Sequence, residues 1–274
     1  MYTEFEKHQF VLVHPLIRGV STYLSLSAIV EGKSRGRIWG NDAFNPDTAL
    51  VWDVANGFVF VLAASKSGIA TSEMRHFFRD ELGPMAKAAG YAKLYTLLLF
   101  KATQTEISEL FMDLSVDTLD LYDFALQRET EIRLHDVDVP WDSRLKRIGR
   151  SVLDLHGLTN IGEVRRCIKA CWQSLDNYLS EGIGFAIFKD GDVASWCSTD
   201  YIVSDKCDLY AETFDGYKQK GFGTIVTLAC VKECFNQNLE IHWHCWPENL
   251  SSIRLAKKVG FLQRPSQPVQ IVTL

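Results

Sequence analysis

A turn built around two glycines, Gly221 and Gly223, constrains the fold of this chain more than any other feature. An apolar strand pattern precedes the turn, and an amphipathic helical pattern follows it. The first N–H groups of a helix have no partner within the helix, and the helix dipole favours negative charge at that end. Lys218 and Lys220 add positive charge beside the turn. An isolated pair of glycines is usually an ordinary strand-to-helix turn, but this setting predicts an α/β fold with a phosphate-binding site.

Strand and helix signals alternate along the chain, and its two halves show a similar order of elements. Asn56-Gly57 and Asp190-Gly191 suit tight hairpin turns. In the first half we expect strands at residues 48–53, 58–63 and 94–100, and helices at residues 73–89 and 103–114. In the second half we expect helices at residues 142–155, 161–179, 221–235 and 250–259, and strands at residues 184–188, 193–198, 207–213 and 239–246. This order predicts two related α/β units.

The boundary between the two units is expected within residues 115–142, a stretch that is acidic and has little clear periodicity. We place it after residue 128, which gives units of residues 1–128 and 129–274. Domains usually contain roughly 100–200 residues, so a chain of this length can form two ordinary cores. In the first unit the loop that corresponds to the glycine turn, residues 65–72, lacks the second glycine and the leading basic residue. The first unit therefore looks degenerate.

Charge and cysteine content exclude several classes of partner and site. A formal net charge of −5 without a basic run argues against binding nucleic acid or an anionic membrane, and it favours a cationic substrate. The cysteines are odd in number and contain no CxxC pair, so they predict neither a disulfide framework nor a zinc site. We find no signal-peptide pattern, and no stretch approaches the roughly 18–20 apolar residues of a membrane span. We expect a protein of the reducing cytoplasm.

Familiar catalytic motifs are absent from the sequence. It contains no G-x-S-x-G, H-E-x-x-H or G-x-G-x-x-G, which removes the motif-based cases for a serine hydrolase, a zincin or a dinucleotide oxidoreductase. His242 and His244 share one face of an expected strand, but no third ligand lies at a telling spacing, so we expect packing histidines and no metal. Cys245 has no partner base that the sequence fixes, and we expect a small buried residue there.

The elements that follow the glycine turn stand in a known order. The loop at residues 218–223 opens a helix, a strand comes next, and Asn249 then precedes a helix that ends in Gly260-Phe261. This order resembles the GNAT superfamily of N-acetyltransferases. The signature of that superfamily is an Arg/Gln-x-x-Gly-x-Gly/Ala loop opening a helix, then a strand, an Asn and a helix ending in Gly-Phe. Lys218 stands where the signature has Arg or Gln.

Further segments are similar to a subfamily of two-part GNAT enzymes that includes the zwittermicin A-resistance-type acetyltransferases. These segments are residues 195–197, 212–213 and 243–246 in the second half, and residues 36–39, 45–46 and 49–53 in the first. The resemblance spans nearly the whole chain. It implies a tandem of GNAT-like mixed sheets flanked by helices, with a degenerate N-terminal unit that is catalytically silent and walls one side of the acceptor cleft.

The resemblance also implies acetyl-CoA as co-substrate. Its pyrophosphate would lie on the backbone amides of the turn, and its pantetheine arm would lie between two splayed strands. The residues that the resemblance assigns to acetyl-CoA are Ala211, Thr213, Lys218, Gln219, Lys220, Gly221, Phe222, Gly223, Thr224, Asn249 and Ser252. The implied reaction is direct attack of a substrate amine on the thioester, which requires alignment of the two reactants and a group that accepts a proton.

Three polar residues on the strand before the turn, Asp208, Tyr210 and Glu212, fall on one face by the two-residue alternation of a strand. Glu212 is the first candidate for the general base and Asp208 the second, against the interpretation that each is a solvated carboxylate. Many GNAT members use a Tyr of the last helix as the acid that protonates the thiolate, and the matching position here holds Ala256. Tyr210 or water would then serve as the acid, or the thiolate leaves without a protein donor.

We therefore expect an N-acetyltransferase that acts on an amine of a small molecule. Two other interpretations stay open. One is an acyl-CoA-binding sensor or scaffold without turnover, which the departures at Lys218 and Ala256 motivate. The other is a protein N-acetyltransferase whose acceptor is a lysine or an N-terminal amine. The sequence indicates neither the acceptor nor the oligomeric state.

Overall fold

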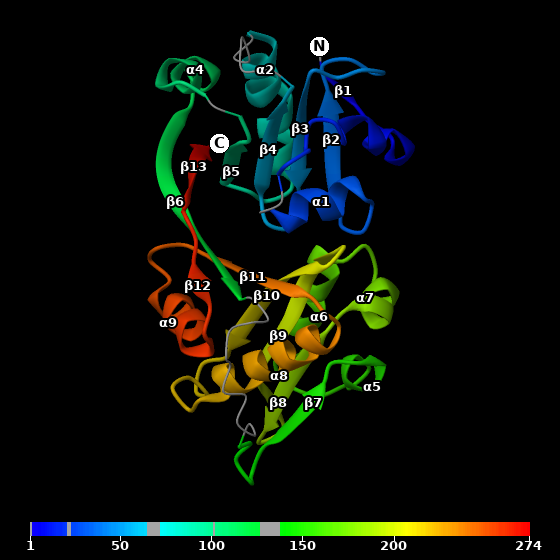
Figure 1. Ribbon diagram of the computed structural model, residues 1–274, viewed down its shortest axis with the longest axis vertical. Coiled ribbons are helices and arrows are strands. Elements are labelled where there is room, and N and C mark those ends of the chain that lie inside the picture. The colour runs from blue at the N-terminus through cyan, green and yellow to red at the C-terminus, as the bar shows by residue number, and fades with distance from the viewer. Residues whose placement is uncertain (1, 21–22, 65–71, 101, 127–137) are drawn as a thin grey trace. The chain divides into compact units, whose positions relative to one another are not determined.

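Two compact units make up the chain in the computed structural model, which describes residues 2–20, 23–64, 72–100, 102–126 and 138–274 (Figure 1). The first unit contains Met1–Asp120 and Pro268–Leu274, and the second contains Leu121–Gln267. This division differs from the expected one, because the C-terminal strand pairs within the first unit, with Gln270 opposite Thr96. Residue 128, where we expected the boundary, and the loop at residues 65–71 lie outside the described residues.

A mixed sheet forms the first unit. Its strands run in the order β1, β2, β3, β4, β5, β13, followed by the first part of β6. Their bounds are Thr3–Glu4, Gly36–Gly40, Thr48–Asp53, Phe58–Ala63, Lys93–Leu98, Gln267–Thr273 and, for β6, Ser115–Leu126. The expected hairpin of β3 and β4 is confirmed, with Trp52 opposite Val59. Gly57, at a φ of 72°, supplies the left-handed residue of its turn.

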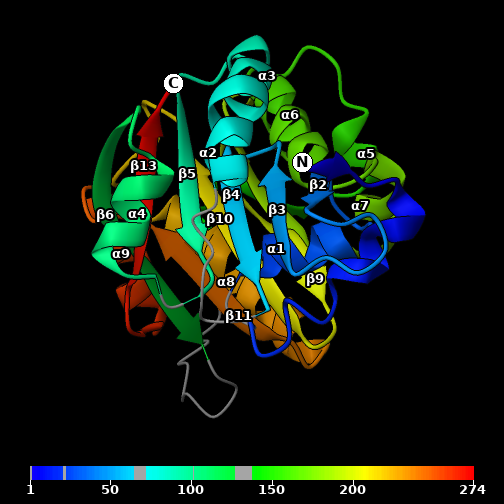
Figure 2. The ribbon, with the colours of Figure 1, turned by 90° about the horizontal axis from the view of Figure 1, so that it is seen from above.

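Helices cover this sheet and fill its core. They are η1 (Lys7–Val13), α1 (Leu24–Val30), α2 (Ser72–Phe77), the π-helix η2 (Phe78–Leu82), α3 (Gly83–Ala88) and α4 (Gln104–Leu110). The helix expected at residues 73–89 is present as α2, η2 and α3, which follow one another in Figure 2, and Pro84 lies in the first turn of α3. A capping box begins α4, because the Thr103 hydroxyl accepts from the Glu106 amide at 3.2 Å and the Glu106 carboxylate accepts from the Thr103 amide at 2.7 Å.

A second mixed sheet forms the second unit, in the order β6, β11, β10, β9, β8, β7, with β12 also paired to β6. The bounds of β7 to β12 are Arg144–Arg147, Gly184–Lys189, Asp192–Val203, Lys206–Thr213, Glu240–Cys245 and Leu262–Gln263. Only β10 and β11 run parallel among these pairs. The hairpin of β8 and β9 turns on Asp190 and Gly191, both at positive φ, as expected.

The helices of the second unit are α5 (Arg150–Leu153), α6 (Ile161–Cys171), α7 (Leu175–Glu181), α8 (Phe222–Asn236) and α9 (Leu250–Val259). Two expectations were wrong here. The stretch at residues 142–155 contains β7 before the short α5, because Leu145 lies opposite Ile187 of β8 in the sheet. The helix expected at residues 161–179 is two helices, because Ser174 ends the extended link and caps α7 through the Asn177 amide at 3.1 Å.

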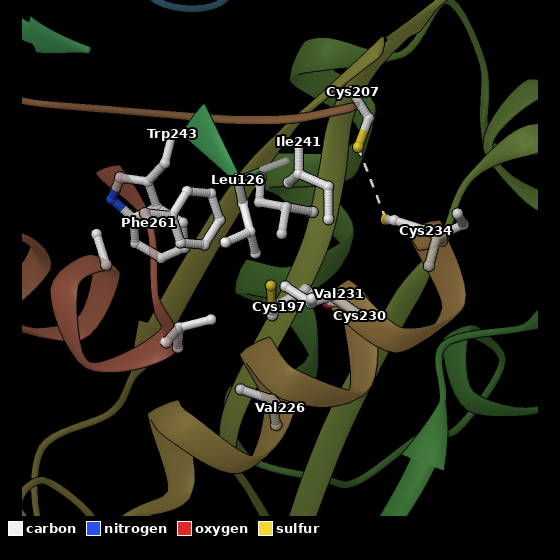
Figure 3. Close-up of a cluster of buried hydrophobic side chains, with 14 of the residues drawn as sticks. Leu126, Cys197, Cys207, Val226, Cys230, Val231, Cys234, Ile241, Trp243 and Phe261 are labelled. Carbon is white, nitrogen blue, oxygen red and sulfur yellow. Dashed lines mark hydrogen bonds between the residues drawn. The ribbon is translucent and has the colours of Figure 1, made fainter. Parts of the chain in front are cut away.

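The core of the second unit lies between α8 and the sheet, and α8 crosses β8 to β10 in Figure 1. Figure 3 shows Val226, Cys230 and Val231 of α8 among these buried side chains. Cys207 of β10 and Cys234 of α8 approach to 3.7 Å between sulfurs, and all seven cysteines are free thiols. The fold class expected from the sequence, mixed sheets flanked by helices, is confirmed. None of the described helices has the length and apolar character needed to cross a bilayer.

Candidate functional site

The strands β10 and β11 separate halfway along their length. They pair through Lys206, Cys207 and Asp208 of β10, which lie opposite Glu240, Ile241 and His242 of β11. Beyond Asp208, β10 continues to Thr213, and among the described residues this part of it pairs with β9 alone. The register of β9 shifts at the same point, which marks a β-bulge. The edge of β10 that faces β11 therefore carries backbone groups without a partner in β11, and we call this place the fork.

The glycine turn joins the end of β10 to α8. Gly221 has a φ of 81° and is the N-cap of α8, where no side chain caps the helix and the first turn has no acidic residue. A Cβ on Gly223 would lie 3.1 Å from the Thr213 hydroxyl, so glycine permits close approach of α8 to β10. The outward N–H groups of this helix end thus lie next to the free edge of β10.

Two lysines flank the turn. Lys218 forms an exposed ion pair with Asp215 at 2.7 Å, which raises the pKa of the lysine. Lys220 lies over the ring of Tyr217 with its Nζ 5.5 Å from the ring centroid. Both lysines lie beside a helix N-terminus whose first turn has no acidic residue. The turn is therefore suited to a phosphate group, with Lys218 in the place of the usual Arg or Gln.

Three further residues that the sequence assigned to the co-substrate, Asn249, Ser252 and Thr213, make contacts that hold the elements around the fork. Asn249 caps α9, because its Oδ1 accepts from the Ser252 amide at 3.1 Å. The Ser252 hydroxyl accepts from the Trp243 indole N–H at 2.8 Å, which ties α9 to β11. On β10, the Thr213 hydroxyl lies 2.8 Å from the hydroxyl of Ser195. These contacts fix the elements around the fork.

One face of β10 brings together Glu212, Tyr210 and Trp196 of β9. The Trp196 indole N–H donates to a Glu212 carboxylate oxygen at 3.3 Å, and the Tyr210 ring centroid lies 5.2 Å from that of Trp196. Burial raises the pKa of Glu212, the Trp196 hydrogen bond lowers it in part, and Glu163 of α6 raises it further. Burial also raises the pKa of Tyr210, so its phenol stays protonated. The carboxylate suits a proton acceptor and the phenol a proton donor.

Asp208 lies on the same face but has different partners. Its carboxylate oxygen is 2.8 Å from Nδ1 of His244 on β11. The other ring nitrogen of His244 lies 3.5 Å from Asp123 of β6, which is 3% exposed. Sequence reasoning noted the histidines but missed Asp123, because β6 lies in the stretch without clear periodicity. Its position follows from the pairing of β6 with β11, which sets Asp123 opposite His244.

The other residues singled out in the sequence are core residues. Ala256, at the position of the usual Tyr, is fully buried in the core of the second unit. Burial raises the pKa of Cys245, so its thiol stays protonated and is a poor nucleophile. The described residues contain no group of three or more His, Cys, Asp or Glu side chains arranged to hold a metal ion.

Comparisons with known proteins agree with this geometry. The model of the GNAT acetyltransferase family matches residues 14–266. An uncharacterised N-acetyltransferase of Bacillus subtilis (strain 168), YdfB, is 29% identical over 90 residues, which are 33% of this chain and 34% of that protein, so the match spans about a third of this relative.

Two solved structures share the fold over nearly the whole chain. A GCN5-related N-acetyltransferase-like protein from Streptococcus suis 89/1591 is 18% identical, with a TM-score of 0.68 over 97% of this chain and 98% of that one. A tandem GNAT protein from the clavulanic acid biosynthesis pathway is 12% identical, with a TM-score of 0.61 over 100% of this chain and 98% of that one. The family match, which covers most of the chain, shows that it belongs to the GNAT acetyltransferase family.

Proposed function

We propose that this chain transfers the acetyl group of acetyl-CoA to a primary amine of a small molecule. The observation that carries the proposal is the uncapped N-terminus of α8, which opens on Gly221 beside the free edge of β10. Amides of residues 219–224 would hold the pyrophosphate, and Lys218 and Lys220 would add charge. The backbone groups of β10 that have no partner in β11 among the described residues offer hydrogen bonds to the pantetheine arm.

The acceptor side of the fork supports a cationic amine as substrate. Glu212 supplies negative charge near the exposed ring of Tyr210, and both features attract an ammonium group. Glu163 of α6 adds a carboxylate that acts on Glu212, although it also pairs with Arg166. The net charge of −5 agrees with a cationic substrate.

The chemistry requires the ammonium form of the acceptor to lose a proton before attack. The free amine nitrogen then forms a bond to the acetyl carbon while the carbon–sulfur bond breaks. The nitrogen loses its second proton as the amide forms, this proton replaces the one that the donor gives to the sulfur, and CoA leaves as the thiol. Glu212 is the first candidate for the group that accepts the ammonium proton, since its pKa is raised, and Asp208 is the second. Tyr210 is protonated and is the candidate donor to the sulfur.

A binding and turnover experiment tests this proposal. Acetyl-CoA should raise the melting temperature of the protein, and a panel of polyamines, aminoglycosides and amino acids should contain at least one amine that triggers release of CoA thiol. Peptides with free lysine or N-terminal amines separate a protein acceptor from a small molecule. Binding without thiol release from any amine or peptide would favour the sensor or scaffold. Absence of binding would contradict the assignment of the glycine turn.

The role of the first unit stays a prediction. We propose that it is catalytically silent, since the sequence of its corresponding loop lacks the second glycine and the leading basic residue. Trp39 and Trp52, two aromatic residues of its strands, are buried in its own core. A variant that destroys the glycine turn of the second unit should therefore remove all binding of acetyl-CoA, with no second site to be measured.

A further inference from the structure

A row of five titratable side chains crosses the second unit, starting at the fork. Its members, in spatial order, are Asp208, His244, Asp123, His242 and Glu240. They come from three neighbouring strands, β10, β6 and β11. Neither the sequence motifs nor the family match assigns this row a role. Such a row is expensive to bury, because ionisable groups lose their hydration and apolar residues would fill the same space without that penalty.

The two imidazole rings connect the three carboxylates. His244 presents Nδ1 to Asp208 at 2.8 Å and Nε2 to Asp123 Oδ1 at 3.5 Å. His242 presents Nδ1 to the same Asp123 oxygen at 3.8 Å and Nε2 to Glu240 at 3.3 Å. Each ring therefore has one nitrogen toward the carboxylate before it and the other toward the carboxylate after it. An imidazole in this position can take a proton on one nitrogen and release a proton from the other.

Burial along the row is high in the middle and lower at both ends. The side chains of Asp208 and Glu240 are 17% and 28% exposed, whereas Asp123 is 5% and His242 is 0% exposed. Within the described part of the chain, Asp123 Oδ1 and both nitrogens of His242 are in ion-pair range without a formed hydrogen bond. No hydrogen bond thus fixes a proton in the middle of the row.

Charges around the row give its two ends different affinities for a proton. Burial alone lowers the pKa of His244, but Asp208 and Asp123 outweigh burial and Arg264, so the pKa of this ring is raised. At the outer end, burial raises the pKa of Glu240, but Arg264 at 2.6 Å and Lys206 at 3.7 Å outweigh it, so the pKa of Glu240 is lowered. A proton is held readily at His244 and released readily to water at Glu240.

We propose that this row is a proton relay, which carries the proton lost by the acceptor amine from Asp208 to solvent at Glu240. The ammonium gives its proton to the Asp208 carboxylate, which passes it to Nδ1 of His244. The Nε2 proton of His244 moves to Asp123, and the same exchange across His242 delivers a proton to Glu240 and then to water. One proton leaves per acetyl transfer and no electrons move.

The relay deepens the proposed function, and it reverses the order of the two candidate bases. Asp208 has a route by which its proton leaves, whereas Glu212 contacts Trp196 and has no imidazole among its hydrogen-bond partners in the described residues. Asp208 is then the group that deprotonates the acceptor. Glu212 instead binds the ammonium group.

A matched pair of surface carboxylates tests the outlet. Glu240→Gln removes the end of the row, and Glu233→Gln removes a carboxylate of α8 with similar side-chain exposure, 27% against 28%, that is also paired to an arginine. The assay measures thiol release from acetyl-CoA with the fastest amine of the panel. At low buffer concentration, Glu240→Gln should lower kcat by about tenfold and leave the KM for acetyl-CoA unchanged. Added imidazole buffer should restore the rate, and Glu233→Gln should match the wild type.

Two results would overturn the relay: Glu240→Gln that turns over like the wild type at low buffer concentration, or a loss that buffer does not restore. A second measurement does not depend on turnover. In NMR titrations of the full chain, Asp208→Asn should shift the titration of His244. If the titration of His244 is the same in this variant as in the wild type, the relay is wrong. Coupled titration without thiol release from any amine would instead count against the proposed function.

Discussion

The two ends of β10 carry carboxylates on the same face, yet the surroundings of these carboxylates differ. Glu212, next to the glycine turn, lies among aromatic rings and has its pKa raised mainly by burial. Asp208, where the fork begins, is bonded to an imidazole that leads into the buried row. The difference teaches that position on a strand face does not define a catalytic role. The side chains that each carboxylate contacts decide whether it binds a positive charge or transfers a proton.

The largest expected effect is a loss of acetyl-CoA binding at the end of β10 that lies next to the glycine turn. Gly221→Val places a β-branched residue at a φ of 81°, which such residues rarely adopt, so the turn must reorganise and lose its aligned amides. We expect the affinity for acetyl-CoA, measured by calorimetry, to fall by about 100-fold or more. The imidazole titrations at the other end of β10 should not change.

Gly191→Val is the matched control, since this residue has a φ of 84° and equally open space around its Cβ, but lies in the hairpin of β8 and β9. It should lower stability by a similar amount and leave binding intact. Equal loss of affinity in both variants would mean that strain, and not the turn, is being measured.

The second-largest effect is expected on kcat when Asp208, the group that takes the proton from the acceptor amine, is replaced. Asp208→Asn keeps the shape of the side chain and removes its basicity, so kcat for acetyl transfer should fall by about 100-fold while the KM values change little. Steady-state thiol release over a range of amine concentrations separates the two parameters. Full activity in this variant would restore Glu212 as the general base.

A smaller effect, on the KM for the amine, is expected at Glu212, at the end of β10 next to the glycine turn. Glu212→Gln removes a charge that binds the ammonium, so the KM for the amine should rise by about tenfold while kcat changes by a few-fold at most. Glu233→Gln again serves as the control. A fall in kcat by orders of magnitude with an unchanged KM would contradict the division of roles between the two carboxylates.

The smallest effect is on stability as a function of pH. The folded-state pKa of His244 is raised above its ordinary value, so its stabilisation is complete below that ordinary value and is lost as the pH rises through the folded-state pKa. The melting temperature of the wild type should thus decline over this window, and the decline should be shallower in Asp208→Asn. Identical pH profiles for the two proteins would show that the Asp208 contact does not hold the proton on His244.

The parts of the fold that the sequence predicted are those set by local signals. The bounds of α9 follow from Asn249 at its N-cap and from Gly260, whose φ of 109° ends the helix. The glycine turn was recognised for the same reason, since the φ of Gly221 and its place between a strand and a helix are local properties.

The missed parts depend on pairing between distant residues. Leu145 of β7 and Ile148, which follows β7, are spaced as in a helix, but pairing with β8 makes residues 144–147 a strand. In the first half of β6, residues 115–120, most side chains are polar or exposed, so the strand pattern in the sequence is weak. The pairing of β6 with β11 is what brings Asp123 to His244. The contacts of Asp123 with His244 and His242 could not be predicted, because they depend on the register between β6 and β11.

The return of β13 to the first unit has a consequence for how the protein is made. This strand lies between β5 and β6, and it consists of residues that leave the ribosome after the whole second unit. The first unit, although translated earlier, therefore lacks an internal strand until the residues of β13 have been made. We expect the first unit, although it is synthesised first, to reach its native fold last, and to bind chaperones for longer than the second unit.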